Sequence, residues 1–307
     1  MRKSASLDLY PFSVNIFNIE ILLKGFSRIN MKFHNLVGMI LVRGLMVEEL
    51  CNLFFELSNE DRLNILYELG KEPLRMSYLS NKLDFTVQET SRNLSRLSEE
   101  GLIRKDNSGF FSLTPYGEQA LKLLPGFKFI SSNREYFKNH KLSTIPYEFA
   151  ISIASLADCD YTGDVMTAFF KIENMIKEAE EYVWILVDQI LASALPLLSD
   201  AIKRGVPFRL ILPHDISPSD ELHELVHLHF SEATENVIDG RFLENIDIVL
   251  SMSEKEVAAL SFPDLGGNFD YLGFNTKNEK AHTWSKKLFN YHWEKATKII
   301  PEQLLEY

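Results

Sequence analysis

The chain of 307 residues contains only two cysteines, Cys51 and Cys159, which lie far apart in the sequence. A disulfide framework or a zinc site needs more cysteines or histidines at short, regular spacing, so the sequence predicts neither disulfides nor a metal site. No stretch reaches the roughly 18 consecutive apolar residues of a membrane helix. Asp8, Asn15 and Glu20 interrupt any signal peptide. These absences favour a cytoplasmic protein without a membrane partner.

Motifs of common nucleotide-binding and hydrolytic enzymes are also missing. The sequence contains no GxGxxG, no GxxxxGK[ST] loop and no GxSxG. Basic residues are in the minority, with 32 Lys and Arg against 43 Asp and Glu and a formal net charge of -11. This balance excludes a protein coated in basic residues for indiscriminate nucleic-acid binding, so any contact with DNA needs a local patch.

What is present is the composition of a folded protein, with 46% hydrophobic and 24% charged residues. Because one domain usually holds about 100 to 200 residues, we expect two domains. The first 45 residues lack a clean period, and strongly patterned sequence begins at Met46. We interpret residues 1–45 either as a misassigned start, with Met46 or Met31 as the true first residue, or as an extra helix that packs on the body or mediates dimerisation.

Residues 46–126 are patterned as a winged helix-turn-helix. Apolar residues at helical steps predict three helices, over residues 46–57, 58–69 (with Ser58 as N-cap) and 76–83. The turn 84–86 follows, and Thr86 with Glu89 forms a capping box that starts a helix over 87–100. Two helices around such a turn are typical of a helix-turn-helix.

The predicted helix over 87–100 has two different faces. Its apolar face contains Val87, Thr90, Leu94 and Leu97. Its outer face is polar and contains Gln88, Ser91, Arg92, Ser95 and Arg96. Arg and Gln side chains can make bidentate hydrogen bonds with guanine and adenine edges in the major groove, while Ser can reach phosphates. We therefore take these five polar residues as candidate DNA-binding residues.

A β-hairpin is predicted directly after this helix, where a wing would lie. Apolar residues at period two flank a polar tip at 106–109, and Lys105 beside this tip is a further candidate for contact with DNA. From 75 to 105 there are six basic and four acidic residues, a local net charge of +2. Phosphate neutralisation by such a patch dominates DNA affinity. The alternatives are a plain structural corner and a winged helix that binds protein.

A further helix and a connecting segment lead to the second domain. Thr114 and Pro115 fit the N-cap and first position of a helix that ends before Pro125-Gly126. Residues 127–147 are interpreted as a connecting helix and loop. Such a helix often supplies the two-fold contact of a regulator, so we predict a homodimer that matches a palindromic site.

Residues 148–300 are patterned as an α/β domain. A helix over 165–181, an apolar strand over 182–187, a helix over 191–204 and a second strand over 207–212 predict a βαβ unit. Polar residues at the carboxyl ends of parallel strands line the crevice where open α/β sheets bind ligands. The candidate ligand-binding residues are Asp188, Gln189, His214 and Asp215. The alternative is that they cap helices and terminate strands.

The rest of this domain gives weaker signals. His223 and His227 are four residues apart, but no third ligand follows at a diagnostic spacing, which favours a solvated helix face over a metal pair. Three strands are predicted, near Ile246–Met252, Val257–Phe262 and Asp270–Phe274. A final helix over 279–299 has aromatic residues at helical steps, a pattern far more typical of a core than of a cofactor site. No cofactor is predicted.

Several segments together resemble one group of proteins. They are SNEDRLNILYEL (58–69), FTVQETSRNLSRLSEEGLI (85–103), FSLTPYGEQAL (111–121), EEYVWILVDQIL (180–191), RGVPFRLILP (204–213) and FDYLGFNTKNEKAHTWSKKLFNYHWEKA (269–296). Over residues 46–298 the chain resembles archaeal winged-helix regulators that carry the domain of FilR1-type methanogenesis regulators. The resemblance implies a transcription regulator whose second domain has a phospholipase D-like fold, as in sugar-sensing archaeal regulators.

The implied fold raises an enzymatic alternative. Phospholipase D chemistry uses a histidine nucleophile in an HxKxxxxD pattern, and no histidine of this chain is followed two residues later by lysine. Without that nucleophile and lysine we expect no phosphoryl transfer and no enzyme. The sequence therefore predicts a regulator that binds double-stranded DNA and responds to a small-molecule effector or a protein partner. The alternatives are a phosphodiesterase-like enzyme with a degenerate site and a winged-helix scaffold.

Overall fold

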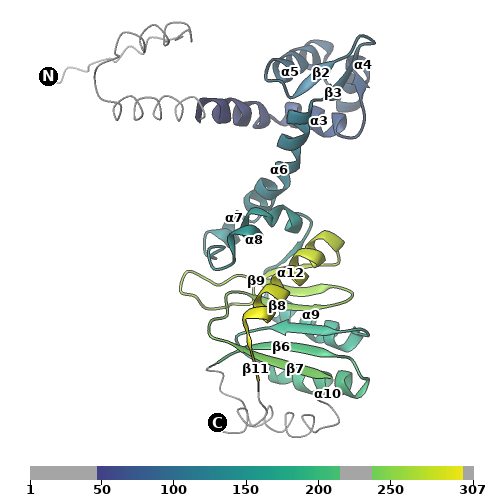
Figure 1. Cartoon of the computed structure of the whole chain (residues 1–307). Coiled ribbons are helices and arrows are strands. Elements are labelled where there is room, and N and C mark those ends of the chain that lie inside the picture. The colour runs from purple at the N-terminus through teal and green to yellow at the C-terminus, as the bar shows by residue number, and fades with distance from the viewer. Residues whose placement is uncertain (1–46, 215–236, 300–307) are drawn as a thin grey trace, which may run out of the picture. The chain divides into compact units, whose positions relative to one another are not determined.

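The computed structural model describes residues 47–214 and 237–299. The chain divides into two compact units, unit 1 (Met1–Glu118) and unit 2 (Gln119–Tyr307) (Figure 1). The predicted extension over residues 1–45, the ligand candidate Asp215 and the histidines of residues 219–231 lie outside the described residues. No helix among the described residues combines the length and the apolar character that crossing a membrane requires.

Unit 1 combines short helices with a small antiparallel sheet. Residues 47–57 are helical, and three further helices are α3 (Glu60–Leu69), α4 (Met76–Leu83) and α5 (Val87–Glu99). The sheet has the order β1-β3-β2, built from β1 (Leu74–Arg75), β2 (Ile103–Lys105) and β3 (Phe110–Leu113). The predicted succession of helices, turn, helix and hairpin is present, and β1 is a strand that the sequence pattern does not indicate.

The turn between α4 and α5 is defined by its capping residues. Asp84 ends α4 in the left-handed conformation, with φ of 56°. The predicted capping box of α5 is confirmed: Thr86 Oγ1 accepts a hydrogen bond from the Glu89 N–H at 3.2 Å, and Glu89 Oε2 accepts one from the Thr86 N–H at 2.9 Å. These bonds satisfy backbone donors that a helix start leaves without partners, so they fix where α5 begins.

The buried side of α5 differs from the predicted one at its first residue. Thr90, Leu94 and Leu97 are buried as expected, and Asn93 joins them. Val87 is 62% exposed, so its assignment to the apolar face is wrong. Val87 occupies the first position of the helix, where no described residue covers it. The buried side of α5 therefore starts one turn later than the hydrophobic pattern indicates, at Thr90.

Two predicted helix boundaries are also wrong. The N-cap of α3 is Asn59 and not Ser58, because Asn59 Oδ1 accepts the hydrogen bond from the Arg62 N–H at 3.0 Å. Helix α6 (Pro115–Ser132) continues through Pro125, where the sequence predicts its end. Proline inside a helix removes one backbone hydrogen bond but does not always end the helix, because packing can offset the loss.

The start of α6 packs tightly against the backbone of unit 1. The predicted N-cap is confirmed, since Thr114 Oγ1 accepts a hydrogen bond from the Gly117 N–H at 3.0 Å and donates one to the Gly101 carbonyl at 2.6 Å. A Cβ atom at Gly117 would lie 2.0 Å from the Leu102 carbonyl oxygen. Only glycine allows this approach, so the first turn of α6 is locked against the start of the hairpin.

Unit 2 is a mixed α/β structure around an eight-stranded sheet of order β11-β7-β6-β5-β8-β9-β10-β4. Its strands are β4 (Asp160–Thr162), β5 (Val183–Leu186), β6 (Phe208–Pro213), β7 (Ile238–Leu243), β8 (Val249–Ser253), β9 (Val257–Ser261), β10 (Gly273–Thr276) and β11 (Thr297–Lys298). Strands β5, β6 and β7 pair in parallel, and the other neighbours pair antiparallel. The predicted βαβ unit is confirmed as β5, α10 and β6.

Helices cover both faces of this sheet and enclose two cores. On one face lie α9 (Val165–Glu178), the 3-10 turn η2 (Ala192–Ala194) and α10 (Leu195–Lys203), packed on Val183, Ile185 and Val187 around β5. On the other face lie α7 (Arg134–Phe137), α8 (Tyr147–Ile151), η1 (Ile153–Leu156) and α12 (Glu279–Lys295), packed on Trp184 and Leu186. Burial on both faces explains why β5 reads as a continuous apolar run.

Several sequence interpretations of this unit need correction. The segment 127–147 is not a separate connecting helix, because Phe129 and Tyr136 are buried in the core beside Phe274. The third predicted strand begins later than expected, at Gly273. Strands β4, β7 and β11 are missing from the sequence prediction, and the predicted helix over 191–204 begins as the turn η2.

Candidate functional site

The outer face of α5 is open to solvent in unit 1. The side chains of Gln88, Ser91, Arg92 and Ser95 are exposed, and none of them has a hydrogen bond or ion pair with another described residue. These residues lie at positions one, four, five and eight of the cluster, which is the spacing of one helical face. Four of the five α5 candidates are therefore displayed together, as the sequence predicts.

Arg96, the fifth candidate on α5, is engaged within unit 1. Its guanidinium bonds both carboxylate oxygens of Glu56, with Nε at 3.1 Å from Oε2 and Nη2 on Oε1, and stacks 5.1 Å from the ring centroid of Phe55. The side chain of Arg96 remains 40% exposed, while that of Glu56 is 9% exposed. Arg96 therefore connects α5 to the helix over residues 47–57, and two of its five N–H donors are used there.

Glu56 is shared between two arginines. Arg62 Nε lies 2.9 Å from Glu56 Oε2, and Arg62 also donates to the backbone carbonyls of Phe55 and Glu56 at the end of the preceding helix. The hydrogen bond from Arg96, together with the positive charge of Arg62, lowers the pKa of Glu56 although burial opposes this. The carboxylate is thus held in its charged form between two guanidinium groups.

The hairpin beside α5 adds further cationic side chains. Arg104 and Lys105 are exposed on β2, where Lys105 Nζ lies 5.4 Å from the ring centroid of Phe111. Arg75 on β1 lies 4.7 Å over the Phe110 ring. Aromatic faces orient these cations without neutralising them. No acidic partner of Arg75, Arg104 or Lys105 is found among the described residues, so their charge is available to a phosphate backbone.

In unit 2 the three described ligand candidates follow the carboxyl ends of two neighbouring strands. Asp188 and Gln189 follow β5, and His214 follows the neighbouring parallel strand β6. His214 is exposed, contacts the Phe242 ring at a centroid distance of 5.2 Å, and donates its backbone N–H to the Leu243 carbonyl at 3.2 Å. No contact between His214 and Asp188 is found within the described part of the chain.

Tyr271 is the partner of Asp188 that the sequence reasoning misses. Its hydroxyl donates a hydrogen bond to Asp188 Oδ1 at 2.6 Å. Tyr271 is buried and holds a left-handed backbone conformation with φ of 59°. Burial, and then the hydrogen bond to Asp188, raise the pKa of Tyr271 well above its ordinary value. The hydroxyl stays protonated and fixes the Asp188 carboxylate at the end of β5.

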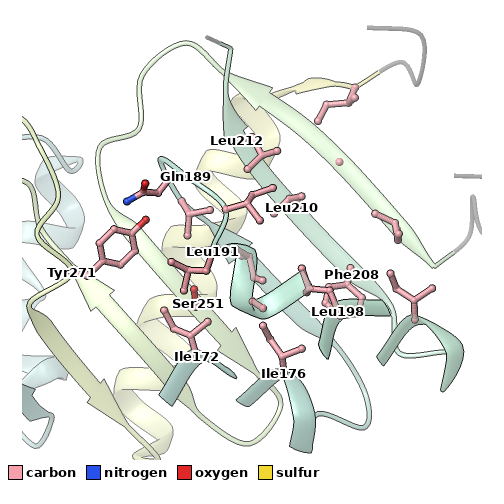
Figure 2. Close-up of a pocket in the computed structure, with 18 residues that line it drawn as sticks. Ile172, Ile176, Gln189, Leu191, Leu198, Phe208, Leu210, Leu212, Ser251 and Tyr271 are labelled. Carbon is pink, nitrogen blue, oxygen red and sulfur yellow. The ribbon is translucent and has the colours of Figure 1, made fainter. Parts of the chain in front are cut away.

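An apolar cavity lies next to this polar pair, between the sheet and the helices α9 and α10 (Figure 2). Its volume is about 80 Å³. Nearly all of the described residues that line it are aliphatic, and Gln189, Tyr271 and Ser251 are the polar ones among them. Ser251 is fully buried on β8, and its Oγ has no hydrogen-bond partner. A buried hydroxyl in this state costs about 1–3 kcal/mol.

Comparison with known proteins leaves the family open. No model of a protein family matches the chain, and no curated protein matches it. The resemblance to FilR1-type regulators thus stays a prediction. The described residues also contain no group of three His, Cys, Asp or Glu side chains that could hold a metal ion.

Similar solved structures include three of interest. An archaeal chromatin protein, TrmBL2, described as showing a novel mode of DNA binding, is 18% identical with a TM-score of 0.39, over 78% of this chain and 94% of that chain. NucT from Helicobacter pylori is 12% identical with a TM-score of 0.35, over 46% of this chain and 98% of that chain. Nuc from Salmonella typhimurium, a phospholipase D family member, is 11% identical with a TM-score of 0.33, over 46% and 96%. Likenesses this weak establish neither fold nor function.

Proposed function

We propose that the chain is a DNA-binding transcription regulator rather than an enzyme, and that unit 1 is a winged helix-turn-helix. The observation that carries the proposal is the solvent-facing side of α5, on which Gln88, Ser91, Arg92 and Ser95 are all exposed and form no side-chain hydrogen bond or ion pair with another described residue. In a winged helix-turn-helix, the helix that follows the tight turn and precedes the hairpin is usually the recognition helix, which contacts the bases.

In the proposed complex, α5 enters the major groove. Arg92 and Gln88 have the donor and acceptor geometry to bond the edges of guanine and adenine, and Ser91 and Ser95 reach phosphates. The hairpin β2–β3 is the wing, and Arg104 and Lys105 contact the sugar-phosphate backbone. Arg96 stays a candidate for contact with DNA, and its bonds to Glu56 also hold α5 in place.

The number of free cations sets the salt dependence of this binding. Because Arg92 is assigned to a base edge, Arg75, Arg104 and Lys105 give three phosphate contacts per chain. Since log K falls with log salt by about 0.9 for each neutralised phosphate of duplex DNA, the expected slope is about -3 per chain. A homodimer on a palindromic site would double this slope.

Unit 2 is proposed to sense an effector and to change the geometry of the dimer. A ligand alters DNA affinity only if it binds one geometry more tightly than the other. We also propose that the mixed sheet of unit 2 is a phospholipase D-like sensor fold. The chain would then be an archaeal regulator of the FilR1 type.

The test starts from chromatin immunoprecipitation with the full chain, which identifies bound promoters. Fluorescence anisotropy then measures affinity for one such duplex. Arg92→Ala should weaken binding by roughly 10- to 100-fold, since one base-reading pair contributes about 1–3 kcal/mol. The control is Lys71→Ala, a mostly exposed cation paired with Glu68 at the end of α3. If Arg92→Ala and the unchanged chain bind the duplex equally well, the assignment of Arg92 to base recognition is contradicted. If the immunoprecipitation enriches a partner protein and no DNA, the winged helix is a protein-binding scaffold.

A further inference from the structure

The cavity of unit 2 has a wall that is selective by charge. Side chains from three elements face each other across it, among them Ile172 and Ile176 of α9, Leu198 of α10 and Leu210 of β6 (Figure 2). No Lys, Arg, His, Asp or Glu is among the lining residues that the structure describes. Burial of an unpaired charge in such surroundings is strongly unfavourable. The lining therefore rejects ions, phosphates and nucleotides, and favours neutral molecules with a large apolar part.

Ser251 is the polar lining residue whose hydroxyl has no hydrogen-bond partner among the described residues. It lies on β8 in the middle of the sheet, paired with Ile185 on one side and Ala259 on the other, and both neighbours are apolar. Other buried serines of the sheet have partners: Ser261 Oγ donates to the Leu272 carbonyl at 2.6 Å, and Ser253 Oγ accepts from the Lys255 N–H at 3.2 Å. Ser251 alone of these three is left with an unused hydroxyl, and that hydroxyl lines the cavity.

We infer that this cavity is a binding site for a small neutral molecule with an apolar body and one polar group. That polar group forms a hydrogen bond with Ser251 Oγ. A ligand group at this point gives the hydroxyl the partner that the protein does not supply. An aliphatic alcohol is the simplest molecule of this class. The role of such a ligand as the effector rests on the proposed function, but its binding does not.

The size of the cavity limits the part of the ligand that is enclosed. Its volume of about 80 Å³ is roughly half of an engineered cavity of about 150 Å³ that takes up benzene. A chain of a few carbon atoms fits, and a longer molecule must extend out of the cavity. Figure 2 shows Gln189 and Tyr271 on one side of the cavity and Leu198 and Phe208 on the other. The side with Gln189 and Tyr271 is the polar end of the site.

The experiment uses three probes with the same six-carbon chain and different head groups: 1-hexanol, hexanoate and hexylammonium. The full chain, labelled at isoleucine and leucine methyl groups, is titrated with each probe and followed by NMR. We expect saturable shifts for 1-hexanol at the methyl groups of Ile172, Ile185 and Leu210, and none for the two charged probes. Absence of saturable shifts with 1-hexanol overturns the proposal, and so does equal binding of hexanoate.

Two matched variants test the hydroxyl. Ser251→Ala should weaken the binding of 1-hexanol about tenfold, the usual effect of one lost hydrogen bond. Ser285→Ala is the control, because Ser285 is also fully buried with an unpartnered Oγ but lies on α12 in the other core. Its affinity for 1-hexanol should not change. Equal affinities for Ser251→Ala and the unchanged chain refute the role given to Ser251.

Both variants are expected to fold, because removing an unpartnered buried hydroxyl costs little or stabilises the protein. Tryptophan fluorescence checks this directly, since Trp184, Trp284 and Trp293 all lie in unit 2. The titration contains no DNA, so failure of the cavity proposal and failure of the regulator proposal are separate results. A chain that binds 1-hexanol but no promoter DNA keeps the site and loses the function.

Discussion

The bonds between Glu56 and its two arginines give a prediction that separates stability from DNA binding in unit 1. Replacing Glu56 with alanine removes a carboxylate that is 9% exposed and leaves Arg62, 8% exposed, without its ionic partner. Loss of one member of a buried ion pair costs about 3–5 kcal/mol. Arg62 keeps its hydrogen bonds to the carbonyls of Phe55 and Glu56, so we expect a cost at the lower end, about 3 kcal/mol.

Arg96→Ala should have a smaller effect than Glu56→Ala, because Arg96 is partly exposed and Glu56 keeps Arg62 as a partner. The double variant, with Glu56→Ala and Arg96→Ala together, should be no less stable than Glu56→Ala alone. The hydrogen bonds between Arg96 and Glu56 are already lost in the single variant. Arg92→Ala, by contrast, should change DNA affinity and leave stability unaltered, because Arg92 has no ion pair or hydrogen bond with another described residue.

The assay must report on unit 1 alone, and tryptophan fluorescence cannot do this because the tryptophans lie in unit 2. Hydrogen–deuterium exchange of peptides from α5 and residues 47–57 is suitable. A cost of about 3 kcal/mol corresponds to roughly hundredfold faster exchange of amides that open with the helix. Unchanged exchange in Glu56→Ala, or equal effects of Arg92→Ala and Arg96→Ala, would refute the assignment of Arg96 to α5 anchoring.

Three further predictions concern packing, pH and the sheet edge. Gly117→Ala should destabilise unit 1 by about 2 kcal/mol or more, because the new Cβ would overlap the Leu102 carbonyl, and exchange of α6 peptides measures this. Burial lowers the pKa of His292 to about 4, so the unfolded chain binds more protons than the folded one between pH 6.5 and 4. Stability should therefore fall as the pH drops through that window, by about 2 kcal/mol from pH 7 to 5, and urea midpoints of His292→Gln should lack this component. Tyr271→Phe should cost about 2 kcal/mol, and a double-mutant cycle with Asp188→Asn should show coupling; simple additivity would contradict the hydrogen bond.

The sequence predicts correctly those structural elements that depend on residues close together in the chain. The capping box of Thr86 and Glu89, the N-cap Thr114 and the apolar run of β5 are read correctly because each depends on neighbours in the chain. Strand β7 is missed for the opposite reason. Its residue Arg241 faces a core, where its guanidinium lies 4.1 Å from the ring centroid of Trp293 on α12. A sequence pattern cannot indicate that a distant aromatic ring will accommodate a charged residue within a strand.

The candidate sites also divide into features that depend on local sequence and features that depend on tertiary packing. The exposed face of α5 could be predicted from helical periodicity, since residues on one face of a helix are fixed by their spacing. Two features could not be: the bond between Glu56 and Arg96, forty residues apart, and the meeting of Ser251 with α9 and α10 at the cavity. Both depend on tertiary packing. The placement of Asp188 and His214 at one sheet edge is intermediate, because it needs only the general rule for parallel strands.

The acidity of unit 1 is the main physical difficulty for DNA binding, and pairing within the unit does not remove it, so the position of the unpaired cations matters. Residues 47–118 include thirteen acidic and eight basic side chains. Glu56 is held by two arginines, Glu68 binds Lys71 and Lys82, and Glu89 serves the cap of α5. None of the four free cations, Arg75, Arg92, Arg104 and Lys105, is used in these pairs. Because screening limits surface charges to about 10 Å at moderate salt, the sign of the local patch, and not that of the whole unit, decides whether phosphates are attracted.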